Sequence, residues 1–126
     1  MRVAYRAKGA DGLALVTDAM EAAGMPDGVY ELSGRRVTVA HGAARLDDGT
    51  LAGAAVTMDE AVRRAAGFLG VSLEEAIRMA TRTPARALGL DRIGQIAPGS
   101  DADLVVLGPD GVVEETLVAG ETVYRV

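Results

Sequence analysis

Cysteine and tryptophan are absent from this 126-residue sequence, and it holds one histidine, one phenylalanine and three tyrosines. Without cysteine the chain has no disulfides, no thiolate metal ligands and no cysteine nucleophile. Because imidazoles usually hold the ion of a hydrolytic metal site, a chain whose only histidine is His41 lacks the usual ligands for one. Any metal chemistry must therefore take its ligands from elsewhere.

Positive charge is also scarce, since 13 Lys and Arg face 18 Asp and Glu and leave a net charge of -5. No basic patch for phosphates is visible, which argues against a nucleic-acid partner. No apolar run approaches the length of a membrane span, and no basic segment precedes an apolar stretch as in a secretory signal. With 49% hydrophobic and 25% charged residues the composition is that of a globular protein, and we expect it to be cytoplasmic.

The most informative stretch is the apolar run at residues 13–16, which continues into Thr17 and Asp18. Four apolar residues without a break are typical of a strand buried on both faces of a parallel sheet. Asp18 would then lie at the C-terminal end of such a strand, where a (β/α)8 barrel carries its catalytic groups. A second interpretation stays open, in which Asp18 only begins a turn. A parallel strand also needs parallel neighbours, and nothing upstream provides one, so the chain resembles a piece of something longer.

Local signals predict helices in the first and middle parts of the chain. Residues 1–8 fit the last turns of a helix that stops at Gly9. Two capping boxes, Thr57 with Glu60 and Ser72 with Glu75, begin two further helices, the first of which ends at Gly70. Thr83 and Pro84 begin a third, short helix that stops at Gly89, with Thr83 as the cap and Pro84 in the first helical position.

Alternating apolar residues and turn signals predict strands elsewhere. The predicted strands are residues 29–32, 35–39, 43–46, 102–107, 112–118 and 121–126. Ser33–Gly34 is the turn of the first hairpin. Asp101 and Asp103 fit the entry to a strand rather than a pair of ligands. Residues 50–54, Thr-Leu-Ala-Gly-Ala, are small and uncharged, which suits either close packing or a backbone that approaches a ligand.

Three segments carry a resemblance to a known family. Residues 15–20 (LVTDAM), 23–28 (AGMPDG) and 48–53 (DGTLAG), in this order, resemble the C-terminal third of the N-acetylglucosamine-6-phosphate deacetylases. Residues 94–107 (GQIAPGSDADLVVL) resemble a closing β-segment of many members of the amidohydrolase superfamily, to which that family belongs. The resemblance covers essentially the whole chain.

The resemblance implies an α/β fold: the C-terminal part of a metal-dependent (β/α)8 amidohydrolase barrel, plus strands of its small β-sandwich domain. Residues 1–93 would supply the last barrel strand (residues 13–18), a β excursion and the closing helices. Residues 94–126 would supply the sandwich strands. The complete enzyme would be a homodimer and would hold a divalent metal ion, zinc or similar, with ligands mostly outside this chain.

The resemblance also implies the chemistry. Asp18 matches the family's general acid/base, and Leu51, Ala52 and Gly53 match a loop over the substrate, N-acetylglucosamine 6-phosphate. Hydrolysis of its N-acetyl group would give glucosamine 6-phosphate and acetate, and the chain by itself is expected to be an inactive fragment. Ala54 departs from the serine expected there, which puts a hydroxyl contact in doubt.

Other interpretations remain for the chain and for its basic residues. One alternative is that the chain is part of another cyclic-amide or N-acyl hydrolase of the superfamily. The other is that it is a non-catalytic module that pairs with a partner chain. His41 and the Arg35–Arg36 pair invite a metal or phosphate role, but a surface or packing role is favoured for His41 and a solvated turn for the arginines.

Overall fold

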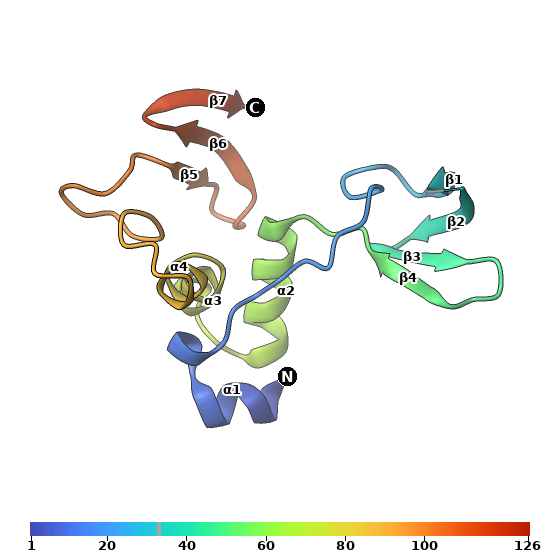
Figure 1. The fold of residues 1–126 in the computed structure, drawn as a ribbon, viewed down its shortest axis with the longest axis horizontal. Helices are drawn as coiled ribbons and strands as arrows, with labels where there is room; N and C mark the ends of the chain where they lie inside the picture. Colours follow the sequence, from blue (N-terminus) through green and yellow to red (C-terminus); the bar gives the residue numbers. More distant parts are fainter. Residues whose placement is uncertain (33) are drawn as a thin grey trace. The chain divides into compact units, whose positions relative to one another are not determined.

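The computed structural model describes residues 1–32 and 34–126 (Figure 1). Its helices are α1 (Arg2–Lys8), the 3-10 turn η1 (Ala10–Gly12), α2 (Met58–Leu69), α3 (Leu73–Ala80) and α4 (Arg82–Ala87). Its strands are β1 (Gly28–Leu32), β2 (Arg35–Ala40), β3 (Ala43–Leu46), β4 (Leu51–Ala54), β5 (Leu104–Leu107), β6 (Val113–Val118) and β7 (Glu121–Arg125). Helices and strands are thus mixed along the chain, as predicted. Ser33, part of the predicted Ser33–Gly34 turn, lies outside the described residues. None of the described helices is long and apolar enough to cross a bilayer.

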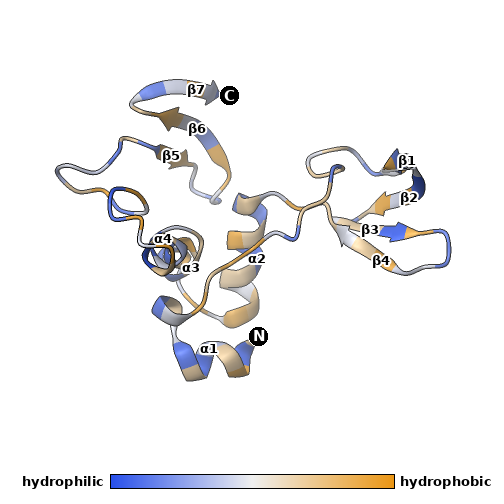
Figure 2. Cartoon of the chain, in the orientation of Figure 1, coloured by the Kyte–Doolittle hydropathy of each residue, from blue (hydrophilic) through white to orange (hydrophobic). Residues whose placement is uncertain are grey.

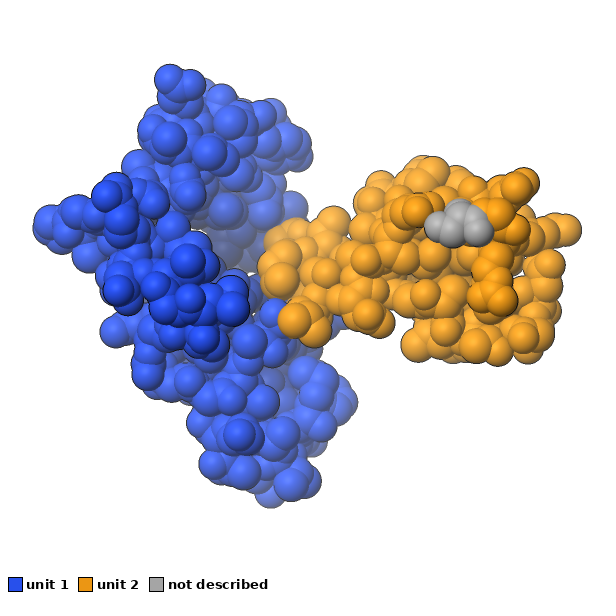
Figure 3. Space-filling model, viewed as in Figure 1, with its two compact units in different colours: residues 1–15, 62–126 blue, residues 16–61 orange. Residues whose placement is uncertain are grey.

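The chain forms two compact units, residues 1–15 with 62–126, and residues 16–61 (Figure 3). The first unit has a core of Ala10, Val62, Ala76 and Met79, of which Ala76 and Met79 are completely buried. This core forms because α2 and α3 each carry apolar residues at helical spacing.

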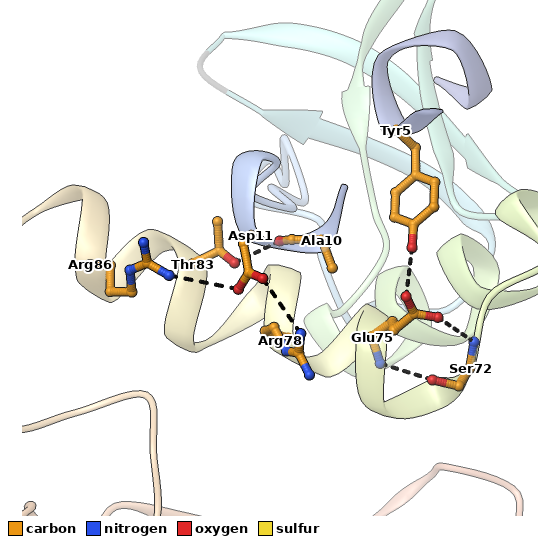
Figure 4. Close-up of polar contacts among 8 residues, drawn as sticks. All are labelled: Tyr5, Ala10, Asp11, Ser72, Glu75, Arg78, Thr83 and Arg86. Atoms are coloured by element: carbon orange, nitrogen blue, oxygen red, sulfur yellow. Dashed lines mark hydrogen bonds and ion pairs between the residues drawn. The ribbon is translucent and has the colours of Figure 1, made fainter. Parts of the chain in front are cut away.

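Hydrogen bonds tie residues 10–15 of the first unit to α3 and α4. The Leu15 amide donates to the Met79 carbonyl at 2.8 Å. The buried Thr83 hydroxyl donates to the Ala10 carbonyl at 2.7 Å (Figure 4). Both bonds satisfy buried or partly buried backbone carbonyls, which otherwise cost free energy when they lose water.

The start of α3 follows its local signal, whereas the start of α4 does not. Ser72 and Glu75 form both bonds of the predicted capping box on α3 (Figure 4). The expected cap of α4 is wrong, because that helix begins at Arg82 after Thr81 and the Thr83 hydroxyl is engaged by the Ala10 carbonyl instead. Pro84 is the third residue of α4 rather than the first. It is still tolerated there because its missing N–H falls in the first turn.

Three strands of the first unit make an antiparallel sheet in the order β5-β6-β7. Ala119 and Gly120 both have positive φ, 52° and 82°, which forms the tight turn between β6 and β7. The Asp103 carboxylate accepts a 2.8 Å hydrogen bond from the Ala119 amide, and Asp101 pairs with Arg92. Both aspartates therefore have structural partners, in agreement with the expected strand entry.

The second unit contains an antiparallel sheet in the order β1-β2-β3-β4, including the predicted hairpin of β1 with β2. Its core consists of Ala22, Val37, Val39 and Ala44, all almost fully buried. Val37 and Val39 alternate with exposed residues along β2, which is the pattern of a sheet with one buried face.

Residues 13–18 do not form the strand, buried on both faces, that the sequence predicts. They belong to no strand, and a single parallel bridge follows them, between Ala19 and Ala54. Leu13 and Leu15 are half-buried against the helical core, whereas Ala14 and Val16 are exposed, Val16 by 78%. Figure 2 shows this apolar stretch in the hydrophobic colours. The physical reason is that a parallel strand exists only through its neighbours, and the described residues supply none beyond that bridge.

Candidate functional site

Asp18 occupies an unusual backbone conformation in the second unit. Its φ is 52°, in the left-handed region that few residues other than glycine adopt, although Asp and Asn tolerate it better than most. The Ala19 amide donates to the Thr17 hydroxyl at 3.2 Å, which closes a short turn around Asp18. Asp18 is exposed to solvent, so its carboxyl group is open to a reactant.

The structure brings Asp18 next to the segment that contains the predicted substrate contacts. The Ala54 amide donates to the Asp18 carbonyl at 3.0 Å, and the Met20 amide donates to the Ala54 carbonyl at 3.0 Å. These two bonds are the parallel bridge between Ala19 and Ala54. The predicted acid and the loop at residues 51–53 are therefore joined through the backbone, although they lie more than 30 positions apart in the sequence.

The three predicted substrate contacts lie on β4 in different surroundings. Leu51 is 59% exposed and offers its side chain to a ligand. Ala52 is half-buried and packs against the core of the sheet, and Gly53 is half-buried as well. A β-bulge in the pairing with β3, between Ala44 and Arg45, changes the register next to this segment. Of the two interpretations of residues 50–54, the Ala52 side chain follows the packing one.

Asp48, in the turn before β4, helps to fix the position of the β4 segment. The Asp48 carboxylate accepts a 2.9 Å hydrogen bond from the Thr50 amide. This bond, with a second from the Thr50 side chain, lowers the pKa of Asp48 below its ordinary value. Asp48 is thus an anionic turn residue that holds the entry to β4, rather than a proton donor.

His41 takes the surface role that the sequence favours, whereas the solvated turn expected for Arg35 and Arg36 is wrong, because both lie exposed on strand β2. His41 and Gly42 have φ values of 53° and 77° and form the turn between β2 and β3. The His41 amide donates to the Asp27 carboxylate at 3.2 and 3.3 Å. Arg36 lies 3.8 Å from Asp47 in an exposed ion pair. These contacts of His41 and Arg36 are with Asp27 and Asp47, and neither involves Asp18.

A metal centre does not fit the residues at hand. Within residues 1–32 and 34–126, no three His, Asp or Glu side chains are grouped as metal ligands. The described residues therefore offer no ligand set of their own for a divalent ion.

Sequence reasoning missed the contacts that assemble the site. Nothing in periodicity or spacing points to the single bridge of Ala19 with Ala54, since one bridge leaves no repeating pattern. Asp27 was also missed as the residue that secures the His41 turn, although the Asp27–Gly28 pair is itself a turn signal.

Known proteins are similar to this chain in sequence. The model of the amidohydrolase family matches residues 7–123. N-acetylglucosamine-6-phosphate deacetylase of Lysinibacillus sphaericus is 43% identical over 120 residues, which are 95% of this chain and 31% of the relative. N-acetylgalactosamine-6-phosphate deacetylase of Escherichia coli O157:H7 is 43% identical over 110 residues, which are 86% of this chain and 29% of the relative. The chain thus spans about a third of the length of these relatives.

Solved structures of deacetylases are similar to this chain in fold as well as in sequence. The crystal structure of N-acetylglucosamine-6-phosphate deacetylase from Thermotoga maritima is 41% identical, with a TM-score of 0.87 over 99% of this chain and 34% of that one. A mutant of N-acetyl-D-glucosamine-6-phosphate deacetylase from Mycobacterium smegmatis, in complex with N-acetyl-D-glucosamine-6-phosphate, is 41% identical with a TM-score of 0.84. That match covers 96% of this chain and 33% of that one. On the family match over residues 7–123, the chain belongs to the amidohydrolase family.

Proposed function

We propose that this chain is the C-terminal part of a deacetylase that hydrolyses the N-acetyl group of N-acetylglucosamine 6-phosphate. The products are glucosamine 6-phosphate and acetate. The observation that carries the proposal is the exposed Asp18 carboxyl, whose backbone is bridged to β4 beside Leu51 and Gly53. The relatives that match nearly the whole chain are named for this reaction or for its galactose counterpart.

Asp18 is the general acid/base of the proposed reaction. Hydrolysis of an amide requires that a water oxygen bond to the acetyl carbon, that the C–N bond break, and that the departing nitrogen gain a proton. The Asp18 carboxylate takes a proton from the attacking water and returns it to the sugar nitrogen. An exposed carboxylate is suited to this exchange because a reactant can reach both of its oxygens.

The β4 segment supplies the proposed substrate contacts. The exposed Leu51 side chain covers the apolar acetyl group or sugar face, and Ala52 and Gly53 line the same segment through their backbone. This arrangement places the contacts within a few residues of Ala54, the residue bridged to Ala19.

The remaining parts of the enzyme belong to the proposal as well. Amidohydrolases are generally metal-dependent, and we assign the ligands of a divalent ion, zinc or similar, to residues outside this chain. We assign residues 1–93 to a (β/α)8 barrel completed by the rest of the enzyme, and residues 94–126 to a small β-sandwich. Residues 13–18, which form no strand in this chain, would pair as the last barrel strand only with neighbours that the N-terminal part supplies. The assembled enzyme is a cytoplasmic homodimer.

A second candidate substrate is N-acetylgalactosamine 6-phosphate. A relative named for that sugar is as identical to this chain, at 43%, as one named for the glucose isomer. The two sugars differ only in the configuration of one hydroxyl, so the reaction and the role of Asp18 are the same for both.

The test is acetate release by an assembled enzyme. The chain is co-expressed with the N-terminal part of a relative that ends where the match begins, and both N-acetyl sugar phosphates are assayed. Asp18→Asn is expected to lower kcat by about 10²- to 10⁴-fold, the usual contribution of a positioned acid/base. Asparagine tolerates positive φ as aspartate does, so the backbone is retained.

Asp47→Asn is the matched control, because it removes the same charge from an exposed turn of the same unit. It is expected to leave kcat unchanged, as is usual for an exposed ion pair. The chain alone is expected to release no acetate. An Asp18→Asn enzyme with unchanged kcat would contradict the assignment.

A further inference from the structure

Gly53 is packed directly against the residue to which we assign proton transfer. Its φ is 147°, a conformation that side-chain-bearing residues rarely adopt. A Cβ at Gly53 would lie 3.4 Å from the Asp18 carbonyl oxygen and 3.4 Å from the Met20 Cβ. The space that a side chain would fill at Gly53 is therefore lined by Asp18 and Met20.

The same contact bears on the conformation of Asp18. Asp18 has a φ of 52°, and a non-glycine residue keeps such a conformation only where its surroundings fix it. Those surroundings include the Ala54 amide, which donates to the Asp18 carbonyl, the Ala54 carbonyl, which accepts from the Met20 amide, and the short turn of Thr17 with Ala19. A side chain at Gly53 would strain the backbone of the segment that makes these bonds, and its Cβ would be in van der Waals contact with the carbonyl that accepts one of them.

We infer that Gly53 is a positioning residue for Asp18: glycine adopts the φ of 147° without strain, and this backbone conformation sets the adjacent Ala54 to hold Asp18 in its left-handed conformation. The inference rests on the proposed role of Asp18 as the proton-transfer group. It gives Gly53 a function distinct from a substrate contact, because the neighbours at its missing Cβ are residues of the chain itself.

Gly53→Ala tests the inference, with Gly49→Ala as the matched control. Gly49 precedes β4 in the same hairpin and also has positive φ, 82°, but nothing lies within 4 Å of its missing Cβ. Both variants therefore introduce a methyl group at a left-handed glycine, and only Gly53→Ala introduces it against Asp18. Both are made in the 126-residue chain.

The first readout is NMR spectroscopy of the backbone. In Gly53→Ala, hydrogen exchange of the Met20 and Ala54 amides is expected to accelerate about tenfold or more relative to the amides of β2. The φ-sensitive three-bond coupling of Asp18 is expected to move toward that of an ordinary negative φ. Gly49→Ala is expected to change neither. Uniform acceleration of all β1–β4 amides, or an unchanged bridge, would overturn the inference.

The second readout is kinetics in the assembled enzyme. Gly53→Ala is expected to lower kcat by a larger factor than it raises KM, because a displaced carboxylate weakens the chemical step more than it weakens binding. If Gly53→Ala loses the bridge between Ala19 and Ala54 but keeps its kcat, the positioning role is overturned. The proposed function is then tested by Asp18→Asn alone. A lost bridge with no effect of Asp18→Asn refutes the proposed function instead.

Discussion

The Tyr5 hydroxyl donates a 2.7 Å hydrogen bond to Oε1 of Glu75, a residue 70 positions away in the chain (Figure 4). The other carboxylate oxygen of Glu75 accepts from the Ser72 amide, so one side chain both caps α3 and anchors α1. The contact holds the pKa of Glu75 below its ordinary 4.5, chiefly through the Tyr5 bond, and it raises the pKa of Tyr5 above its ordinary 10.0.

These shifts predict how the stability of the helical unit depends on pH. Because the folded pKa of Glu75 is lowered, its contribution is present above pH 4.5 and is lost as the pH falls through the folded value. Because the pKa of Tyr5 is raised, its contribution is present below pH 10 and is lost as the pH rises through the folded value. Tyr5→Phe is therefore expected to flatten both limbs of a plot of unfolding free energy against pH.

Urea unfolding of the chain at a series of pH values measures this effect. Tyr124→Phe is the control, because it removes a hydroxyl from an exposed position on β7. Equal curves for Tyr5→Phe and the unchanged chain at both extremes of pH would show that the Tyr5–Glu75 bond contributes no stability.

Loss of the capping box on α3 gives a second prediction. The Ser72 hydroxyl accepts from the Glu75 amide at 3.2 Å and so satisfies one of the free amides in the first turn of α3. Ser72→Ala is expected to lower the free energy of unfolding by about 1 kcal/mol, whereas Ser72→Thr keeps the hydroxyl and most of the stability. Thermal unfolding followed by circular dichroism distinguishes the three proteins, and equal losses for Ala and Thr would exclude the capping explanation.

The helical core gives a third prediction. Met79 is completely buried and is the largest side chain of the core cluster that it forms with Ala10, Val62 and Ala76. Met79→Ala is expected to lower the free energy of unfolding by about 2 to 5 kcal/mol. Met58→Ala, at a position that is 40% exposed, is expected to lose far less. The urea midpoints of the two variants are the measurement, and similar midpoints would show that the core tolerates the cavity.

Sequence reasoning succeeded where a few neighbouring residues decide the structure. Gly9 ends α1 and Gly70 follows the end of α2, both with positive φ, and Ser72 with Glu75 begins α3. The hairpin of β6 and β7 turns at Ala119 and Gly120 as predicted. Each of these signals depends only on residues close together in the sequence, so it can be recognised without knowing the tertiary contacts.

Sequence reasoning failed where a distant partner decides the structure. The apolar run at residues 13–16 is the composition of a buried strand, but a strand requires hydrogen-bonded neighbours and the described residues supply one bridge. The Thr83 hydroxyl was assigned to a cap, yet the Ala10 carbonyl, 73 positions away, engages it. The bridge that brings Asp18 beside β4 likewise has no signal in the sequence, because no periodicity encodes a single bridge.

Leu51 gives the last prediction, which separates binding from catalysis. Its side chain is 59% exposed, so Leu51→Ala is expected to change the free energy of unfolding by about 0.5 kcal/mol or less. In the assembled enzyme the same change removes apolar surface that the substrate would cover, and KM is expected to rise about tenfold with kcat nearly unchanged. Val29→Ala is the matched control, since Val29 is 54% exposed on β1 of the same unit and has no proposed contact with substrate. Steady-state acetate release gives both constants, and an equal KM for the two variants would remove Leu51 from the substrate site while leaving the role of Asp18 intact.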